Sequence, residues 1–293
     1  SEMCIRDSFA AIEKWMRELL TGMVESNMST MFTDVNEKTS EIAAQVGRTP
    51  QNWNSSVFSM IQNLSESVVV PIAGIIITLV LCYELISMLT ERNNLHDVDT
   101  WMFFKYFVKA WVAIYLVSNT FTITMAVFDV GQSVVNSASG IINGETAIDV
   151  SSLSMQMQAA MATMEIGELV VLALETFLVS FCMKIMSVVI TVIVYGRMIE
   201  IYLYTSLAPI PFATMSNREW GHVGTNYFRG LFALAFQAFL MMVCVAIYAA
   251  LISSVRISSN MHSALIGVAA YTVILCFSLM KTGSLSKQIF GSH

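Results

Sequence analysis

The sequence predicts an all-α polytopic membrane protein, with about five transmembrane helices, a re-entrant or interfacial segment and an N-terminal amphipathic helical region. Apolar residues make up 56% of the 293 residues and charged residues only 12%, about half the charged fraction of soluble domains. Mean hydropathy is +0.66, and several apolar stretches reach the roughly 20 residues that a helix needs to cross about 30 Å of hydrocarbon. A water-facing surface cannot be built from this composition, which excludes a soluble enzyme.

The charge pattern argues against a nucleic-acid-binding surface. The net charge is −6 and the 15 basic residues are scattered, with no run of Lys and Arg, so any contact with DNA is expected to be weak and transient. Cys82, Cys182, Cys244 and Cys276 lie in apolar segments without CxxC spacing, where a thiol behaves as a small hydrophobe. The histidines show no metal-ligand spacing, and no catalytic motif is present. We therefore expect no cofactor, no metal and no enzymatic activity.

Residues 1–66 form the predicted extramembrane region, and 9–25 read as an amphipathic helix. Its apolar residues are Phe9, Ile12, Trp15, Met16, Leu19, Leu20 and Met23, and its polar face carries Glu13, Lys14, Arg17, Glu18 and Glu25. This helix is suited to a membrane surface, to a partner, or to covering its own neighbours. Residues 1–8 resemble translated sequencing-adapter read-through, so we expect them not to be native.

Residues 67–293 form the predicted multi-span membrane domain. Its apolar segments cover 67–88, about 110–128, 166–195, about 230–251 and about 264–280. The aromatic and basic stretch 101–109 is expected at the membrane interface, where aromatic rings and lysines settle. The apolar block continues from 166 to 207, too long for one perpendicular span, so the number of crossings there stays open.

A polar region follows the second predicted span. Residues 131–164 contain no Lys or Arg, and we interpret them as a loop in which Gly131, Gly140 and Gly144 are ordinary flexible-loop glycines. A second break is predicted at 207–215, because Pro209 and Pro211 lack amide donors and constrain the residues before them. This segment should not cross the bilayer as a helix. The chain is expected to become helical again at Ser216, where the sequence Ser216-Asn217-Arg218-Glu219 fits a capping box.

The distribution of basic residues predicts the orientation, because Lys and Arg near span ends mark the cytoplasmic side. They cluster between spans one and two (Arg92, Lys105, Lys109), between spans three and four (Arg197, Arg218, Arg229) and after span five (Lys281, Lys287). The loop 131–164 has none, and 252–263 has only Arg256. The N-terminus is therefore predicted outside and the C-terminus in the cytoplasm.

Several charged residues fall inside or beside apolar blocks, where such groups normally meet another charge, the bundle interior or water. They are Glu84, Glu168, Glu175, Lys184, Arg197 and Glu200. Arg197 and Glu200, three residues apart, can pair on one helix face, and an interfacial ion pair that anchors the helix is the simpler reading. Glu175 and Lys184, nine apart, point to opposite faces. Lys184 is thus expected to pair with Glu84 within one molecule, or to meet a neighbouring subunit or a water-filled passage.

Four short motifs between residues 195 and 244 resemble one family. They are Tyr195-Gly196-Arg197-Met198-Ile199-Glu200-Ile201-Tyr202, Leu207-Ala208-Pro209-Ile210-Pro211, Asn217-Arg218-Glu219-Trp220 and Gly230-Leu231-Phe232-Ala233-Leu234-Ala235-Phe236-Gln237. Together they resemble the TrbL-type polytopic inner-membrane subunits of conjugative type IV secretion systems, over about the last two-thirds of the chain. The region before residue 67 departs from the family pattern.

The resemblance implies a membrane-embedded channel or scaffold subunit that helps to transfer DNA or protein across the bacterial inner membrane. It also implies work beside an ATPase and other channel proteins, and it supplies no catalytic residues. We expect a homo-oligomer. Two alternatives stay open: a self-contained small-solute or ion transporter, suggested by the intramembrane charges and the proline break, and a peripheral scaffold that uses the amphipathic start.

Overall fold

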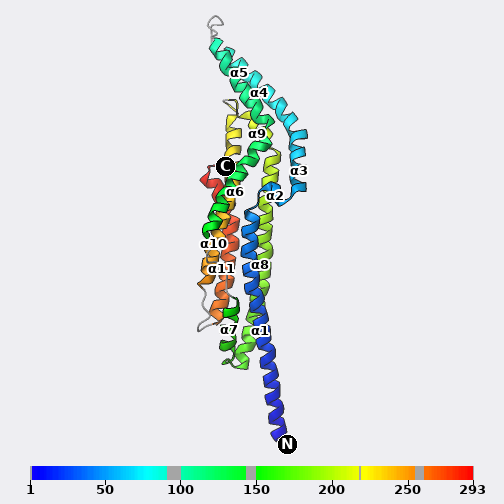
Figure 1. Cartoon of the computed structure of the whole chain (residues 1–293), viewed down its shortest axis with the longest axis vertical. Coiled ribbons are helices and arrows are strands. Elements are labelled where there is room, and N and C mark those ends of the chain that lie inside the picture. Colours follow the sequence, from blue (N-terminus) through cyan, green and yellow to red (C-terminus); the bar gives the residue numbers. More distant parts are fainter. Residues whose placement is uncertain (1, 91–99, 143–149, 218, 255–260, 293) are drawn as a thin grey trace. The chain divides into compact units, whose positions relative to one another are not determined.

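The computed structural model describes residues 2–90, 100–142, 150–217, 219–254 and 261–292 (Figure 1). In these ranges every regular element is helical: α1 Glu2–Val46, α2 Pro50–Trp53, α3 Ser55–Leu64, the π-helix η1 Ser65–Val69, α4 Val70–Thr90, α5 Thr100–Ser118, α6 Thr120–Ile142, α7 Val150–Met161, α8 Ile166–Ser206, α9 Pro209–Thr214, α10 Gly221–Ser253 and α11 Met261–Ile289. The predicted all-α class is confirmed.

Five helical stretches of the described ranges are long and apolar enough to cross a membrane. They are Ser55–Thr90, Thr100–Ser118, Ile166–Ser206, Gly221–Ser253 and Met261–Ile289. The predicted number of spans is therefore confirmed. Within 166–207, where the number of crossings was open, the chain forms one 41-residue helix, α8. At 1.5 Å per residue such a helix is about 60 Å long, roughly twice the thickness of the hydrocarbon core.

The chain divides into two compact units. Unit 1 comprises residues 1–44, 139–193 and 242–280, and unit 2 comprises 45–138, 194–241 and 281–293. This division follows contacts in space, whereas the predicted boundary between an extramembrane region (1–66) and a membrane domain (67–293) concerns the bilayer. That boundary stays a prediction.

In unit 1, α1 packs along α8. Arg17 donates to the Met164 carbonyl at 2.8 Å, Asn27 to Thr176 at 3.5 Å, and Lys38 to Thr191 at 3.2 Å. The partner numbers rise together, so the two helices are parallel. The buried face of α1 carries Val24, Met28, Met31, Phe32, Val35 and Ile42 at helical spacing. The apolar residues near the start of α1 are exposed instead, such as Phe9 at 68% and Trp15 at 62%.

In unit 2, α4, α5 and α9 pack around one core, and α6, α8 and α10 around another (Figure 1). The first core contains Ala73, Ile77 and Leu81 of α4, Ala113 and Val117 of α5, and Ala208, Phe212, Ala213 and Tyr227. The second contains Val127 and Phe128 of α6, Met198 and Ile201 of α8, and Leu231, Leu234 and Ala235 of α10. Short α9 is thus held between two candidate spans, α4 and α5.

The second span differs from its predicted position. The predicted segment 110–128 straddles α5 and α6, and the candidate span is 100–118, which includes the stretch 101–109 that was expected at the interface. One residue, Asn119, interrupts the helix, and its side-chain amide donates to the Tyr115 carbonyl at 2.9 Å. Asn competes for backbone groups in this way and weakens a helix interior. The cations of α5 are paired within unit 2, with Lys105 over the Trp101 ring and Lys109 on Glu84.

The expected loop 131–164 is mostly helical in its described parts, which belong to α6 and α7. Gly131 is not a loop glycine: a Cβ built on it would lie 2.9 Å from the Ala235 carbonyl oxygen. Gly131 therefore allows α6 and α10 to approach closely. Gly140 also lies in α6, and Gly144 lies outside the described residues. The polar residues misled the prediction because they occupy one face of α6, with the apolar residues on the other.

Candidate functional site at the proline corner

The turn from α8 to α10, which we call the proline corner (residues 204–230), is the best-defined candidate site. α8 ends at Ser206, α9 occupies Pro209–Thr214, and α10 begins at Gly221. The chain thus breaks where the two prolines predict it. Pro209 has no N–H with which to continue the helix, and the Ala208 amide donates to Thr205 three residues back, at 3.2 Å. The Tyr204 carbonyl consequently needs another donor.

Tyr227 of α10 supplies that donor. Its hydroxyl donates to the Tyr204 carbonyl at 2.8 Å, and the Tyr204 hydroxyl donates to the Tyr227 carbonyl at 3.1 Å. The two rings stack with their centroids 4.4 Å apart and their planes 7° from parallel. Tyr227 is 8% exposed, and a buried phenol normally requires such a partner. This reciprocal pair fastens the end of α8 to the start of α10.

Two glycines of α10 make room for the corner. A Cβ on Gly230 would lie 2.1 Å from the Tyr204 hydroxyl, and a Cβ on Gly224 would lie 2.5 Å from the Pro211 carbonyl oxygen. Both distances are well below van der Waals contact, so any side chain would displace the tyrosine or the backbone of α9. The glycines are required by packing here rather than by an unusual backbone angle.

Glu84 of α4 also reaches the corner. Its carboxylate accepts from Lys109 of α5 at 2.5 Å and from the Asn217 side chain at 3.4 Å. Pairing with Glu84 is one of the outcomes predicted for Lys184, and within unit 2 the partner of Glu84 is Lys109. The reason is that α4 and α5 pack against each other, which brings Glu84 to Lys109, 25 residues later.

The start of α10 is capped one residue later than predicted. Asn217, rather than Ser216, accepts the amides of Glu219 and Trp220, at 2.7 and 3.0 Å. Asn217 is 4% exposed, and the Ser216 hydroxyl is buried without a hydrogen bond. Arg218, part of the predicted capping box, lies outside the described residues. So do Arg92 and Arg256, which contribute to the predicted orientation.

Arg197 and Glu200 have different partners, so their predicted ion pair is not what the structure shows. Glu200 binds Lys287 of α11 at 2.9 Å. Arg197 is 7% exposed and donates to the Leu234 carbonyl at 3.4 Å, while its Nε is buried with no hydrogen-bond partner. Arg197 thus lies inside unit 2, between α8 and α10, whereas Glu200 reaches the end of α11.

In unit 1, Glu175 of α8 pairs with His262 of α11. Lys184 is exposed on α8 and forms no ion pair among the described residues. Glu175 and Lys184 therefore do not meet, as their spacing predicts. Glu168 accepts the Glu165 amide at 3.2 Å at the start of α8, where the helix dipole favours a carboxylate.

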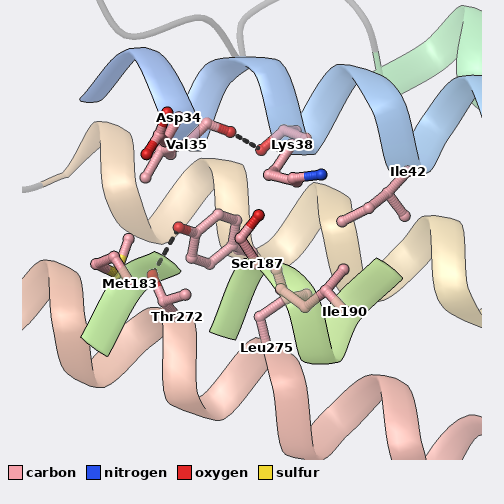
Figure 2. A pocket seen from close by; sticks show the side chains of 11 residues that line it. Asp34, Val35, Lys38, Ile42, Met183, Ser187, Ile190, Thr272 and Leu275 are labelled. Atoms are coloured by element: carbon pink, nitrogen blue, oxygen red, sulfur yellow. Dashed lines mark hydrogen bonds between the residues drawn. The ribbon is translucent and has the colours of Figure 1, made fainter. Parts of the chain in front are cut away.

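Unit 1 also contains a small cavity between α1, α8, α10 and α11 (Figure 2). Asp34, Lys38 and Ile42 of α1 face Ser187 and Ile190 of α8 across it (Figure 2). Tyr248 and Thr272 share a hydrogen bond of 2.8 Å at its wall. Its volume, about 20 Å³, accommodates about one water molecule. The cavity is therefore too small for a transported solute.

Sequence reasoning missed the tyrosine pair, the packing glycines and the role of His262. Tyr204, Tyr227, Gly224 and Gly230 lie within or beside the motifs quoted for the family resemblance, whereas Gly131 and His262 do not. In none of these cases does the spacing carry a signal of contact. Helix period shows which residues share a face, and it does not show which helices become neighbours. No group of His, Cys, Asp and Glu among the described residues is arranged to hold a metal ion.

The comparisons with known proteins point to one family. No curated protein and no solved structure matches the chain. The family model described as TrbL/VirB6 plasmid conjugal transfer like protein matches residues 35–209. The match begins before residue 67, so it includes part of the region that departs from the quoted family pattern. It ends inside the window 195–244. Because the match covers more than half of the chain, the protein belongs to the TrbL/VirB6 plasmid conjugal transfer-like family.

Proposed function

We propose that the protein is a non-enzymatic channel or scaffold subunit of a conjugative type IV secretion apparatus that transfers DNA or protein. The family match over residues 35–209 carries this proposal. It includes α4, α5 and α8, three of the helices that form candidate spans, and ends at Pro209 of the proline corner. We propose that the chain lies in the bacterial cytoplasmic membrane, with its N-terminus outside and its C-terminus in the cytoplasm.

The surface of the spans supports a role within an assembly. Only 11% of the apolar window of α5 and 17% of that of α8 are buried, so most of their surface is available to lipid or to other subunits. Family membership implies association with other conjugal transfer components. We propose that these include further copies of this chain and a secretion ATPase, with transient contact with transferred DNA.

The proposal is supported by the kind of residues at the corner. Tyr204, Tyr227, Gly224 and Gly230 act through shape and hydrogen bonding. The corner is thus suited to fixing the angle between two spans. The one-water cavity of unit 1 is too small to hold a transported solute.

The test is deletion of the gene in a donor strain, followed by complementation with the tagged chain. We expect transfer frequency to fall to background while the other secretion proteins keep their levels, and to return with the intact chain. A chain that keeps all five candidate spans but carries Gly230→Trp at the proline corner is tested in the same deletion strain, and its transfer frequency is compared with that of the intact chain. Normal transfer by the deletion strain would contradict the proposal, and solute-dependent flux by the purified protein in liposomes would favour a transporter.

A further inference from the structure

Two side chains of opposite charge are exposed in unit 1. Lys184 lies on the exposed side of α8, and Glu37 lies on the exposed side of α1. Neither forms an ion pair with a residue that the structure describes. Exposed apolar side chains flank Lys184 on α8: Phe181 at 56%, Ile185 at 45% and Val188 at 64%. Lys184 is thus a cation on a face that otherwise suits hydrocarbon.

The small cavity of unit 1 shows that the two charges lie at one level of the helices. Lys38 of α1, Met183 of α8 and Thr272 of α11 all border this cavity (Figure 2). Glu37 directly precedes Lys38, and Lys184 directly follows Met183. Thr272 lies near the middle of the apolar part of α11, a candidate span. Both charges are therefore at the level of the middle of that span.

Side chains at this level need a protein neighbour or water. Charged groups inside a membrane normally face another charge, the bundle interior or a water-filled space. The exposed side of α1 around Glu37 is also poorly suited to lipid, because it carries hydroxyls at helical spacing: Ser26, Ser29, Thr33 and Ser40. Small and hydroxyl residues are enriched where helices pack together in membranes. This face of α1 is therefore suited to contact with another helix.

The two charges do not meet within one molecule, because other residues hold α1 against α8. Asn27 of α1, for example, donates to Thr176. Copies of a chain in one membrane share one orientation, so residues at equal depth in one copy are at equal depth in the next. Lateral contact between two copies can therefore bring Lys184 to Glu37 without a vertical shift.

This geometry favours a second copy over an unrelated partner. One kind of contact between copies compensates both charges at once, whereas an unrelated protein would have to supply an acid at one place and a base at another. Most oligomers are symmetric assemblies of identical chains, in which such a contact is repeated. The charge complementarity at one depth is thus the observation that identifies the partner.

We infer that a second copy of this chain docks on unit 1, with Lys184 of one copy paired to Glu37 of the other. The inference deepens the proposed function, on which it rests for the membrane setting and for the presence of further copies. It places the middle of α1 within the bilayer beside α8, rather than in the predicted extramembrane region 1–66. The hydroxyl face of α1 then packs against the neighbouring copy.

Charge reversal in two tagged versions of the full chain tests the inference. The two versions carry different tags and are co-expressed. The measurement is the amount of one version that copurifies with the other from detergent-solubilised membranes, relative to the amount of each in the membrane. The variants are Lys184→Glu and Glu37→Lys. Lys281→Glu is the matched control, at another exposed lysine of a candidate span.

Like charges should meet when both versions carry Lys184→Glu, or when both carry Glu37→Lys. Copurification should then fall at least about tenfold, because like charges placed together across an interface are strongly unfavourable. One Lys184→Glu version with one Glu37→Lys version should restore copurification to within about twofold of the wild type, since opposite charges meet again. Lys281→Glu should neither lower copurification by itself nor restore that of Glu37→Lys.

Two results would overturn the inference. The first is unchanged copurification when both versions carry Lys184→Glu. The second is a loss that the mixture of Lys184→Glu and Glu37→Lys versions does not restore, which would indicate a separate partner for each charge.

Cross-linking provides a second measurement if the charge-reversed chains do not accumulate. Chains whose five native cysteines are alanine carry Lys184→Cys in one tagged version and Glu37→Cys in the other, and a short bifunctional thiol reagent is added. We expect a cross-link between the two tags. Met16→Cys replaces Glu37→Cys in the control and should give none, because Met16 lies about 30 Å from Glu37 along α1. Lack of the first cross-link would refute the contact.

The inference and the proposed function fail separately, because copurification and cross-linking do not depend on transfer. If deletion of the gene leaves transfer unchanged, the proposed function fails whatever the two tags show. If deletion abolishes transfer while chains that all carry Lys184→Glu still copurify normally, only the contact between Lys184 and Glu37 is refuted.

Discussion

The hydroxyls of Tyr204 and Tyr227 each donate to the other's backbone carbonyl, at 3.1 and 2.8 Å. This exchange joins two helices at the place where Pro209 removes a donor from the backbone. A helix end buried without partners would be costly. The tyrosine pair therefore offsets the effect of the proline. The helix is interrupted at the corner, but the two helices on either side are held firmly together.

Tyr227→Phe should destabilise the protein while retaining the stacked ring. The substitution removes the donor to the Tyr204 carbonyl and leaves that carbonyl unsatisfied, at a cost of about 1–3 kcal/mol. The apparent melting temperature of the purified protein in detergent measures this effect. Tyr115→Phe, at an exposed tyrosine, is the matched control and should change little. Equal shifts for the two variants would contradict the role of the pair.

Gly230→Ala should destabilise the corner, because the new Cβ would lie 2.1 Å from the Tyr204 hydroxyl. Overpacking of this kind costs about 1–3 kcal/mol. Gly267→Ala in α11 is the matched control: a Cβ there has nothing within 4 Å, and alanine is favoured over glycine in a helix by about 1 kcal/mol. The two variants should shift the melting temperature in different directions, and a stabilising Gly230→Ala would disprove the close approach.

Glu84 and Lys109 should show coupled free energies of unfolding. A double-mutant cycle with Glu84→Gln and Lys109→Met in mixed detergent micelles should give an interaction of about 0.5–3 kcal/mol, as contacting residues do. Lys105→Met is the control, since Lys105 lies over the Trp101 ring and should add independently of Glu84→Gln. Additivity of Glu84→Gln with Lys109→Met would show that the observed pair contributes nothing to stability.

Lys184→Met should reduce transfer without lowering the amount of protein. Lys184 is exposed on a candidate span, and a charge at mid-membrane costs at least about 2.5–3.5 kcal/mol unless water or another subunit receives it. Transfer frequency and the size of the complex on a native gel are measured together, with Lys281→Met as control. Normal transfer with a complex of normal size would remove Lys184 from the functional residues.

Residues 131–164 should be external and residues 212–229 cytoplasmic. Impermeant thiol labelling of intact cells should modify Met155→Cys and not Asn226→Cys, both at exposed positions. Asn226 is preferable to Asn217, because Asn217 caps the start of α10 and is buried. The reverse pattern, with only Asn226→Cys labelled, would overturn the orientation.

The spans could be predicted because membrane insertion depends on composition over about 20 residues. The predicted segments 230–251 and 264–280 lie within α10 and α11. The predicted position of the second span was wrong because a single residue, Asn119, separates α5 from α6. A window average does not register such a break, since the backbone hydrogen bonds continue across it.

The partners of the charged residues could not be predicted in the same way. Their identity depends on which helices pack together, which no single-helix pattern contains. Glu84 has Lys109, Glu200 has Lys287 and Glu175 has His262. The packing roles of Gly131 and Gly230 could not be predicted for the same reason. Only a neighbour within van der Waals distance distinguishes a packing glycine from one in a loop.

The most direct test of the account is purification of the tagged chain from membranes of conjugating donor cells, with quantitative detection of the secretion ATPase encoded beside the transfer genes. We predict that the ATPase copurifies with the intact chain and that the deletion strain transfers no detectable plasmid. Two results together would contradict the account. The chain would purify from these membranes without the ATPase or any other transfer protein, and donors that lack its gene would conjugate normally.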